Sequence, residues 1–233
     1  MSFYARDLAY VHDAGFGGFA RDAAPGVVRR LRRAGIRDGL VIDVGAGSGI
    51  LARALTDARY DVLGIDQSEE MVEMARRAAP AARFEHASIL DIVPPRCVAI
   101  TAVGEVLSYA NAAPEVFRWT AHCLKRGGLL LFDVATPGRE RAEPRRTWHQ
   151  GDDWVLCLEA SRDGHTLTRH IALFRRADQS WRRSDETHVL RLYDPDEVIS
   201  QLDDAGFTAT RIRSYGRELR PAPGLACFAA TRR

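Results

Sequence analysis

Several features are scarce in this chain of 233 residues. Lysine occurs once, at Lys125, so the 33 basic residues are almost all arginines, and 31 acidic residues leave a net charge of +2. This balance provides no broad cationic field, so we expect no nucleic-acid partner. The sequence also lacks an uncharged apolar run of about 18 residues and a signal-peptide pattern, which predicts a cytoplasmic protein with no membrane partner.

Cysteines are also few, and they are far apart in the sequence: Cys97, Cys123, Cys157 and Cys227. Each stands beside apolar residues, and no pair has the spacing of a metal or redox motif, so we expect four buried, reduced thiols. The 46% hydrophobic and 27% charged content is sufficient for one globular domain with a modest insertion and excludes a disordered or fibrous chain.

Between Leu40 and Val134 the chain alternates short β-rich runs with amphipathic stretches. This alternation predicts an α/β fold with a doubly wound parallel sheet. The expected strands are Leu40–Val44, Asp61–Asp66, Arg83–Ala87, Val98–Ala102 and Leu129–Val134. The expected helices are Pro25–Ala34, Ile50–Asp57, Glu69–Ala78 and Ala113–Leu124, the last ended by Gly127 and Gly128.

Beyond Asp133 the pattern predicts an antiparallel insert over residues 137–193. It consists of three alternating segments, Trp154–Arg162, His165–Arg175 and Trp181–Tyr193, with Asp163 and Gly164 predicting a type I′ turn between the first two. Asp194 caps a helix that ends at Gly206, and two β-rich runs follow, Phe207–Ser214 and Leu225–Thr231. We therefore divide the chain into a core of residues 25–136 and 194–233, the insert, and a leading segment of residues 1–24.

The most informative segment runs from Val41 to Ala52, where an apolar strand enters a turn with Gly45, Gly47 and Gly49 and continues as a helix. Glycines allow the backbone to adopt positive φ and to approach a ligand closely, and a helix start offers free N–H groups. Ile50 stands where a dinucleotide fingerprint has its third glycine. Asp66 ends the next strand, where its carboxylate is placed to accept hydrogen bonds from a ribose diol.

With these motifs, the chain resembles the class I S-adenosylmethionine-dependent methyltransferases, from about Pro25 to Asp133 and in the last two strands. The resemblance implies a seven-stranded, mostly parallel, Rossmann-like sheet whose last strand is antiparallel, with S-adenosylmethionine as cofactor. It implies contacts with the methionyl part, the ribose, the adenosine and the sulfonium from Asp43, Gly45, Ala46, Gly47, Gly49, Asp66, Gln67, Met71, Ser88, Ile89, Val103 and Gly104.

The acceptor side is less determined by the sequence, because in-line methyl transfer relies on positioning and requires no fixed catalytic residue. Glu105 and Tyr109 are expected near the methyl group, as an amine anchor, a general base, a turn cap or core packing. Residues 1–24 resemble an aromatic lid of small-molecule methyltransferases, and His12 is expected over the donor, in simple helix packing or exposed at the surface. Together with the insert over the acceptor site, this favours a small-molecule acceptor, and the oligomeric state stays open.

The last insert segment contains Glu186 and His188, which share one face of a strand. Their arrangement resembles an acid-x-His pattern of small-molecule N-methyltransferases, but the preferred interpretation is a solvated cross-strand pair. Four aromatic residues are expected either to cover an apolar acceptor pocket or to pack the insert: Trp148, Trp154, Phe174 and Trp181.

Compared with metal-using relatives, Asp133 fits one ligand position, Val134 replaces an asparagine, and no acid ends the strand at Ala102. The expected reaction is therefore metal-independent methyl transfer to an N or O atom of a small metabolite. Two alternatives are a non-catalytic S-adenosylmethionine-binding module and a nicotinamide-dependent dehydrogenase, which Ile50 argues against.

Overall fold

The computed structural model describes residues 4–93, 95–109, 113–140 and 143–233, so residues 1–3 of the predicted lid lie outside the described residues. Its larger sheet has seven strands in the order β10-β11-β5-β4-β1-β2-β3. The strands are β1 (Leu40–Val44), β2 (Asp61–Asp66), β3 (Arg83–His86), β4 (Cys97–Ala102), β5 (Leu124–Ala135), β10 (Phe207–Ile212) and β11 (Leu225–Arg232). Parallel ladders join β3, β2, β1, β4 and β5, and β11 is antiparallel to both of its neighbours, β5 and β10. The predicted Rossmann-like sheet with an antiparallel last strand is confirmed.

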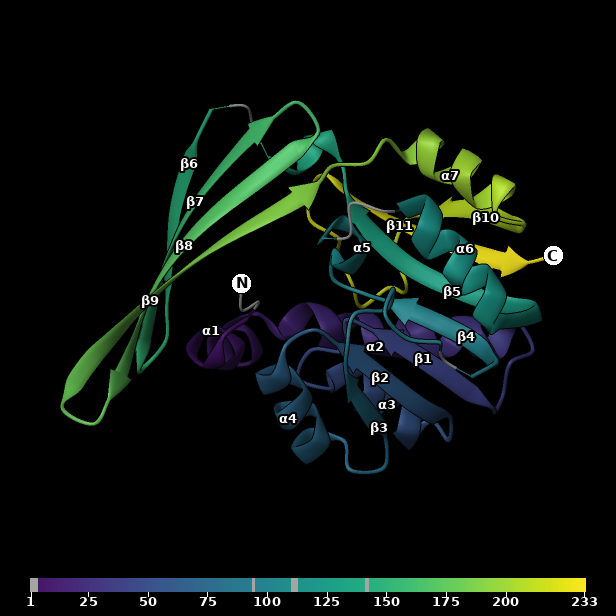
Figure 1. The fold of residues 1–233 in the computed structure, drawn as a ribbon, viewed down its shortest axis with the longest axis horizontal. Coiled ribbons are helices and arrows are strands. Elements are labelled where there is room, and N and C mark those ends of the chain that lie inside the picture. Colours follow the sequence, from purple (N-terminus) through teal and green to yellow (C-terminus); the bar gives the residue numbers. More distant parts are fainter. Residues whose placement is uncertain (1–3, 94, 110–112, 141–142) are drawn as a thin grey trace.

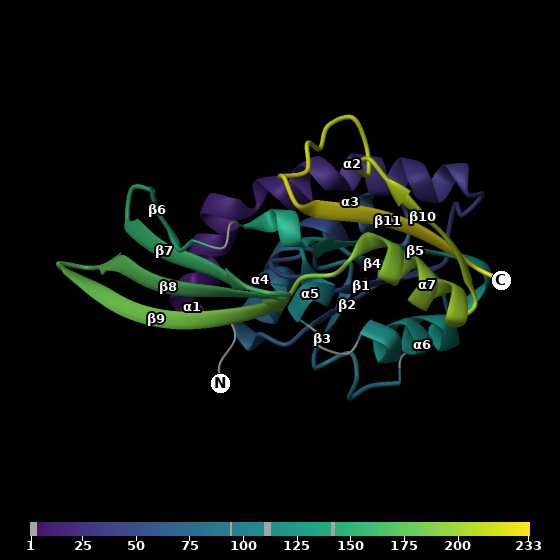
Figure 2. The ribbon, with the colours of Figure 1, turned by 90° about the horizontal axis from the view of Figure 1, so that it is seen from above.

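Helices cover both faces of this sheet (Figures 1 and 2). On one face, α2 (Gly18–Arg33), α3 (Ile50–Asp57) and α4 (Glu69–Ala78) bury aliphatic residues such as Val27, Leu55 and Val72. On the other face, α6 (Ala113–Cys123) and α7 (Pro195–Asp204) bury Phe117 and Leu202 among others. The short α5 (Val106–Tyr109) follows β4. This arrangement leaves the carboxyl ends of β1, β2 and β4 at one edge, where ligands of open α/β sheets bind.

Two predicted helix boundaries are wrong for local reasons. The helix expected to begin at Pro25 begins at Gly18, and α2 continues through Pro25. Its buried face offsets the one backbone hydrogen bond that proline cannot make. The helix expected to reach Leu124 ends at Cys123, because Leu124 already pairs with Cys97 in β5, and Gly127 takes a φ of +76° within that strand instead of ending the helix.

The insert forms a second, four-stranded antiparallel sheet that extends away from the core (Figure 1). Its strands are β6 (Arg145–Gln150), β7 (Trp154–Asp163), β8 (Thr166–Ala177) and β9 (Ser180–Arg191). The last three match the predicted segments, whereas β6 was not expected, because it is an edge strand of largely exposed polar residues without alternation. Asp163 pairs directly with Thr166, so the two-residue turn is Gly164 and His165, with Gly164 at a φ of +53°. A type I′ turn requires positive φ at both central residues, and His165 does not have it, so the predicted type I′ turn is wrong.

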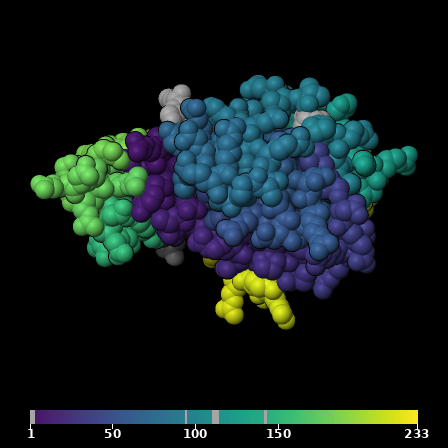
Figure 3. All heavy atoms as spheres, turned by 90° about the horizontal axis from the view of Figure 1, so that it is seen from below, coloured from purple at the N-terminus to yellow at the C-terminus, as the bar shows by residue number. Residues whose placement is uncertain are grey.

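The N-terminal segment lies between the insert and the core, as Figure 3 shows for the purple atoms between the green and blue surfaces. It consists of α1 (Arg6–Val11) and η1 (His12–Phe16), and it packs Leu8 and Val11 against Trp154 of the insert. Trp154 is therefore a packing residue, while Trp148 and Trp181 are 67% and 52% exposed.

The four cysteines are free, and three of them are buried as expected; Cys157 is exposed, because its side chain lies on the outer face of β7.

Candidate functional site

The glycine turn after β1 contains two kinds of glycine. Gly45 and Gly49 are required by packing, because a Cβ atom there would lie 2.5 Å from Val106 and 3.0 Å from Ala75. Gly47 has a φ of +54°, and a Cβ at this position would meet nothing within 4 Å. Gly104, which follows β4, has the same property at a φ of +104°. Open space over two left-handed glycines at the carboxyl edge of the sheet is where a ligand can touch the main chain.

Asp66 is held at this edge by the main chain. Its carboxylate accepts hydrogen bonds from the N–H groups of Gly47, at 2.8 Å, and Ser68, at 2.9 Å. The carboxylate oxygens can accept further hydrogen bonds, which fits the hydroxyl groups of a ribose. Burial raises the pKa of Asp66 above its ordinary value, although these N–H groups counteract the shift.

Asp43, at the end of β1, is 2% exposed and carries an unsatisfied oxygen. Its Oδ1 accepts a hydrogen bond from the Thr101 hydroxyl at 2.7 Å, whereas Oδ2 has no partner among the described residues. Burial raises the pKa of Asp43 to about 7. A buried carboxylate oxygen without a donor is unfavourable by itself, and a ligand carrying an ammonium group would satisfy it.

The remaining residues expected to bind the cofactor occur around the same edge. Met71 is buried in the first turn of α4, whose N-cap is Ser68, and Ile89 is also buried. Ser88 is partly exposed, and Gln67 is exposed beside Asp66. Ala46 is buried, and Val103 is partly buried before Gly104. The structure thus brings the sequence-predicted donor residues to the carboxyl ends of β1 to β4.

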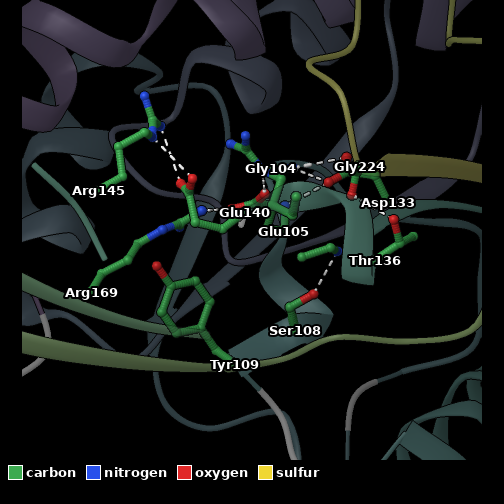
Figure 4. Close-up of polar contacts among 12 residues, drawn as sticks. Gly104, Glu105, Ser108, Tyr109, Asp133, Thr136, Glu140, Arg145, Arg169 and Gly224 are labelled. Carbon is green, nitrogen blue, oxygen red and sulfur yellow. Dashed lines mark hydrogen bonds and ion pairs between the residues drawn. The ribbon is translucent and has the colours of Figure 1, made fainter. Parts of the chain in front are cut away.

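Glu105 has an unusual environment. Its φ is +62°, a strained conformation for a residue other than glycine, and the Asp133 carboxylate accepts the N–H groups of Gly104 and Glu105, the latter at 2.5 Å. The Glu105 side chain forms ion pairs with Arg139 and, at 2.9 Å, with Arg169 (Figure 4). Burial alone would raise the pKa of Glu105, but these two guanidiniums hold it below its ordinary value. A carboxylate in this state is a weak proton acceptor.

Tyr109 belongs to a hydrogen-bonded series that the sequence did not reveal. Its hydroxyl lies 3.2 Å from Nδ1 of His188, whose Nε2 lies 3.0 Å from the Glu186 carboxylate. His188 is 2% exposed, so the expected solvated pair of Glu186 and His188 is wrong: the shared face points inward, against the lid. The physical reason is that Glu186 also accepts the backbone N–H groups of Tyr4 and Ala5.

The predicted lid connects this series with the carboxyl edge of the large sheet, which we call the donor edge because the predicted donor residues lie there. The Ser48 hydroxyl donates to Asp13 at 2.5 Å, and the Ser68 hydroxyl donates to the carbonyl of Tyr4 at 2.9 Å. The Tyr4 ring contacts His12 and His188 edge to face, with centroid distances of 5.0 and 4.9 Å. Burial lowers the pKa of His12 to about 4, which keeps its ring neutral. His12 therefore packs within the lid, next to the acceptor-side residues.

Several of these residues were missed by sequence reasoning. Arg169 lies on β8, on the same side of the strand as the buried Leu167 and Leu173, so a charge among inward-facing apolar positions was a usable signal. Arg139 follows β5 in a short 3₁₀ turn and gave no such signal.

The part of the chain that the structure describes contains neither a helix that could cross a membrane nor a cluster of metal-binding side chains. Its helices include none long and apolar enough to cross a membrane. Its His, Cys, Asp and Glu side chains form no group of three or more that could hold a metal ion.

Comparison with known proteins agrees with this geometry. The sequence matches the family described as Methyltransferase domain over residues 16–212. It is 27% identical over 220 residues to the dTDP-3-amino-3,6-dideoxy-alpha-D-glucopyranose N,N-dimethyltransferase of Streptomyces fradiae. The aligned region covers 88% of this chain and 85% of that protein.

Two solved structures share the fold. An S-adenosylmethionine-dependent methyltransferase from Clostridium acetobutylicum has a TM-score of 0.84 at 16% identity, with 97% of both chains covered. CalS10, an amino pentose methyltransferase from Micromonospora echinaspora with bound S-adenosylmethionine, has a TM-score of 0.78 at 18% identity, covering 96% of this chain and 97% of that one. Because the family match spans most of the sequence, the chain belongs to the methyltransferase-domain family and is a class I S-adenosylmethionine-dependent methyltransferase.

Proposed function

We propose that this enzyme methylates an N or O atom of a small molecule, by in-line displacement without a metal ion. The observation that carries the proposal is the series Glu186, His188 and Tyr109, which is enclosed between the lid and the insert. Side chains buried beneath the N-terminal segment, such as His188, suit a small-molecule acceptor rather than a polymer. The named relatives act on an amino sugar and an amino pentose, which makes amines the first acceptor class to test.

The donor half of the proposal rests on the carboxylates and the open glycines. The Asp66 oxygens would bind the ribose hydroxyls, and the unpartnered Oδ2 of Asp43 would face the donor's ammonium group. Gly47 and Gly104 would let the main chain approach the methionyl part and the sulfonium. The cofactor supplies an already activated methyl group, so these residues bind and orient rather than activate.

The acceptor half gives the leaving proton a route. With the proton of His188 on Nε2, that N–H donates to Glu186, and Nδ1 accepts the hydroxyl proton of Tyr109. The Tyr4 oxygen, 3.4 Å from that of Tyr109, makes a long contact, and an acceptor N–H or O–H would take its place. As the new bond to carbon forms, the acceptor proton passes to the Tyr109 oxygen while the Tyr109 proton passes to His188. The resulting imidazolium is stabilised by the Glu186 carboxylate.

In this scheme Glu105 is a positioning residue. It neutralises Arg139 and Arg169 beside Tyr109 and keeps them in place (Figure 4). His12, neutral and packed against Tyr4, orders the lid over the acceptor.

The test is a product screen with the purified protein, S-adenosylmethionine and pools of small amines and alcohols. Formation of S-adenosylhomocysteine should require an acceptor, and mass spectrometry should detect a product heavier by one CH₂ group. A chelator should leave the rate unchanged. If the donor binds but no pool gives a methylated product, or if only a nucleic acid or protein is methylated, the proposed acceptor class is wrong.

A further inference from the structure

A second concave site lies outside the methyl-transfer site, between the C-terminal half of α2 and the segment that follows β10. It has a volume of about 500 Å³ and is lined by Arg29, Arg30, Arg33, Arg213, Ser214, Tyr215, Arg217 and two glycines. Figure 2 shows the yellow segment between β10 and β11 beside α2. Helical rise places Arg30 about 18 Å along α2 from Gly18, the first residue of this helix. The pocket is therefore separate from the donor edge.

The charges in this pocket are not balanced. Glu218 pairs with Arg29, and its other oxygen lies 3.5 Å from Nε of Arg217. Among the described residues, Arg33 and Arg213 form no ion pair or hydrogen bond. Five arginines thus line the pocket, and among the described residues Glu218 is the one carboxylate paired with any of them, in a protein whose total net charge is only +2.

The position of one guanidinium is fixed before any ligand arrives. Arg30 donates from Nε to the carbonyl of Tyr215 and from Nη2 to that of Ser214, both at 2.8 Å. Burial lowers the pKa of Arg30, and the nearby charge of Arg33 lowers it further. Like charges held close together are unfavourable, and an anion between them would relieve the repulsion.

The walls of the pocket are also built tightly. A Cβ at Gly26 would lie 2.5 Å from the carbonyl carbon of Tyr215, so only glycine allows the helix and the segment to approach this closely. Tyr215 is 2% exposed, and its hydroxyl donates to Asp133 at 2.7 Å, which anchors the segment to the core. The arginines therefore project from two elements that are fixed against each other.

We propose that this pocket binds a small molecule carrying a diphosphate or triphosphate group. Guanidinium forks match phosphate oxygens in geometry, and a ligand with several charges can engage arginines of both walls at once. A single phosphate would reach fewer of the five. The concave shape and the low net charge of the whole protein favour a compact anion over a nucleic-acid strand.

The test uses the full chain and inorganic pyrophosphate as the probe, with titration calorimetry at constant ionic strength. Pyrophosphate and tripolyphosphate should bind, and sulfate and monophosphate should bind at least about tenfold more weakly. A double variant, Arg33→Ala with Arg213→Ala, should weaken pyrophosphate binding by about tenfold or more, because two charge-assisted contacts are removed. Neither residue holds the fold together, so the melting temperature should stay unchanged.

A matched control removes the same charge elsewhere. Arg118 and Arg126 are exposed residues of α6 and β5, and Arg118→Ala with Arg126→Ala should change pyrophosphate affinity by less than about twofold. An equal loss in both double variants would show nonspecific charge attraction and overturn the proposal. So would the absence of binding at millimolar pyrophosphate, or binding of a single-stranded oligonucleotide alone. S-adenosylmethionine affinity, measured in the same samples, keeps this result distinct from that of the methyl-transfer site.

Discussion

The proposed donor edge, at the carboxyl ends of the parallel strands, and the proposed acceptor side of this enzyme are built from different parts of the polypeptide. At the donor edge, main-chain groups set the geometry: Gly47 and Gly104 leave open space, and the N–H groups of Gly47 and Ser68 orient Asp66. On the acceptor side, side chains hold one another, as in the series from Glu186 through His188 to Tyr109. A site made from the main chain resists most side-chain changes, whereas a side-chain network can change its substrate through a few substitutions.

The largest expected effect comes from a side chain that fills the open space over Gly47 at the donor edge. Gly47→Leu adds a side chain in the open space and strains a φ of +54°, so S-adenosylmethionine binding should be lost in calorimetry. Gly127→Leu is the matched control, because Gly127 has a φ of +76° and equally open surroundings away from the site. Both variants carry similar backbone strain, and only the first should lose the donor. Equal loss in both would point to instability instead.

A substitution on the acceptor side should lower turnover and leave the affinity for the donor nearly unchanged. Tyr109→Phe removes the hydroxyl that lies 3.2 Å from His188, so turnover should fall by about 10²-fold, the lower end of a general acid-base contribution. Donor affinity should stay within about threefold, measured by calorimetry beside single-turnover rates. Tyr10→Phe, which removes a hydroxyl bonded to Asp153 near the edge of the insert, serves as the control. A Tyr109→Phe enzyme with normal turnover would contradict the proton route.

Asp66 tests a side chain that the proposal places against the ribose of the donor. Asp66→Ala should weaken donor binding by roughly 2 to 3 kcal/mol, since hydrogen bonds to a charged group contribute about 1.5 to 3 kcal/mol each and water replaces part of them. Asp66→Asn should impair affinity more than folding. An unchanged dissociation constant for Asp66→Ala would assign the ribose hydroxyls to another residue.

Glu105 lies between the donor edge and the acceptor side, and its substitution should mainly change the stability of the protein. Glu105→Gln removes the charge that pairs with Arg139 and Arg169, which should lower the free energy of unfolding by about 1 to 2 kcal/mol in urea titrations. As a positioning residue it should raise the KM for the acceptor more than it lowers kcat. A hundredfold fall in kcat at unchanged stability would instead make Glu105 the proton acceptor.

The last test concerns the pH dependence of stability. Because burial raises the pKa of Asp43 to about 7 from an ordinary 3.8, the folded protein binds more protons than the unfolded chain between these values. The contribution of Asp43 to stability is therefore complete below about pH 4 and is lost as the pH rises toward about 7. Subtracting the Asp43→Asn curve from that of the original protein, in urea unfolding without cofactor, should show this decline. A difference in unfolding free energy that rises with pH would show that folding lowers the pKa of Asp43 and does not raise it.

The sequence could predict what lies within consecutive residues. Residues 43 to 49 contain a strand end, a turn and a helix start together, and the strand spacing locates Asp66 and Gly104 at the same edge. Their contacts with the cofactor stay a prediction. The acceptor side depends on pairs that are far apart, such as Arg139 with Glu105, 34 residues away, and Tyr4 with Glu186, 182 residues away. No local pattern encodes such pairs, because they arise only when distant segments pack together in the folded chain.

The attachment of the lid on two sides has a dynamic consequence. Residues Tyr4 and Ala5 hydrogen-bond to the insert through Glu186, while Ser48 and Ser68 hold the same segment to the core. The insert therefore cannot swing away from the core without breaking bonds on one side of the lid. Hinge motion of the insert and exposure of the cofactor edge become one coupled movement, and amide hydrogen exchange in residues 4–16 would follow its frequency.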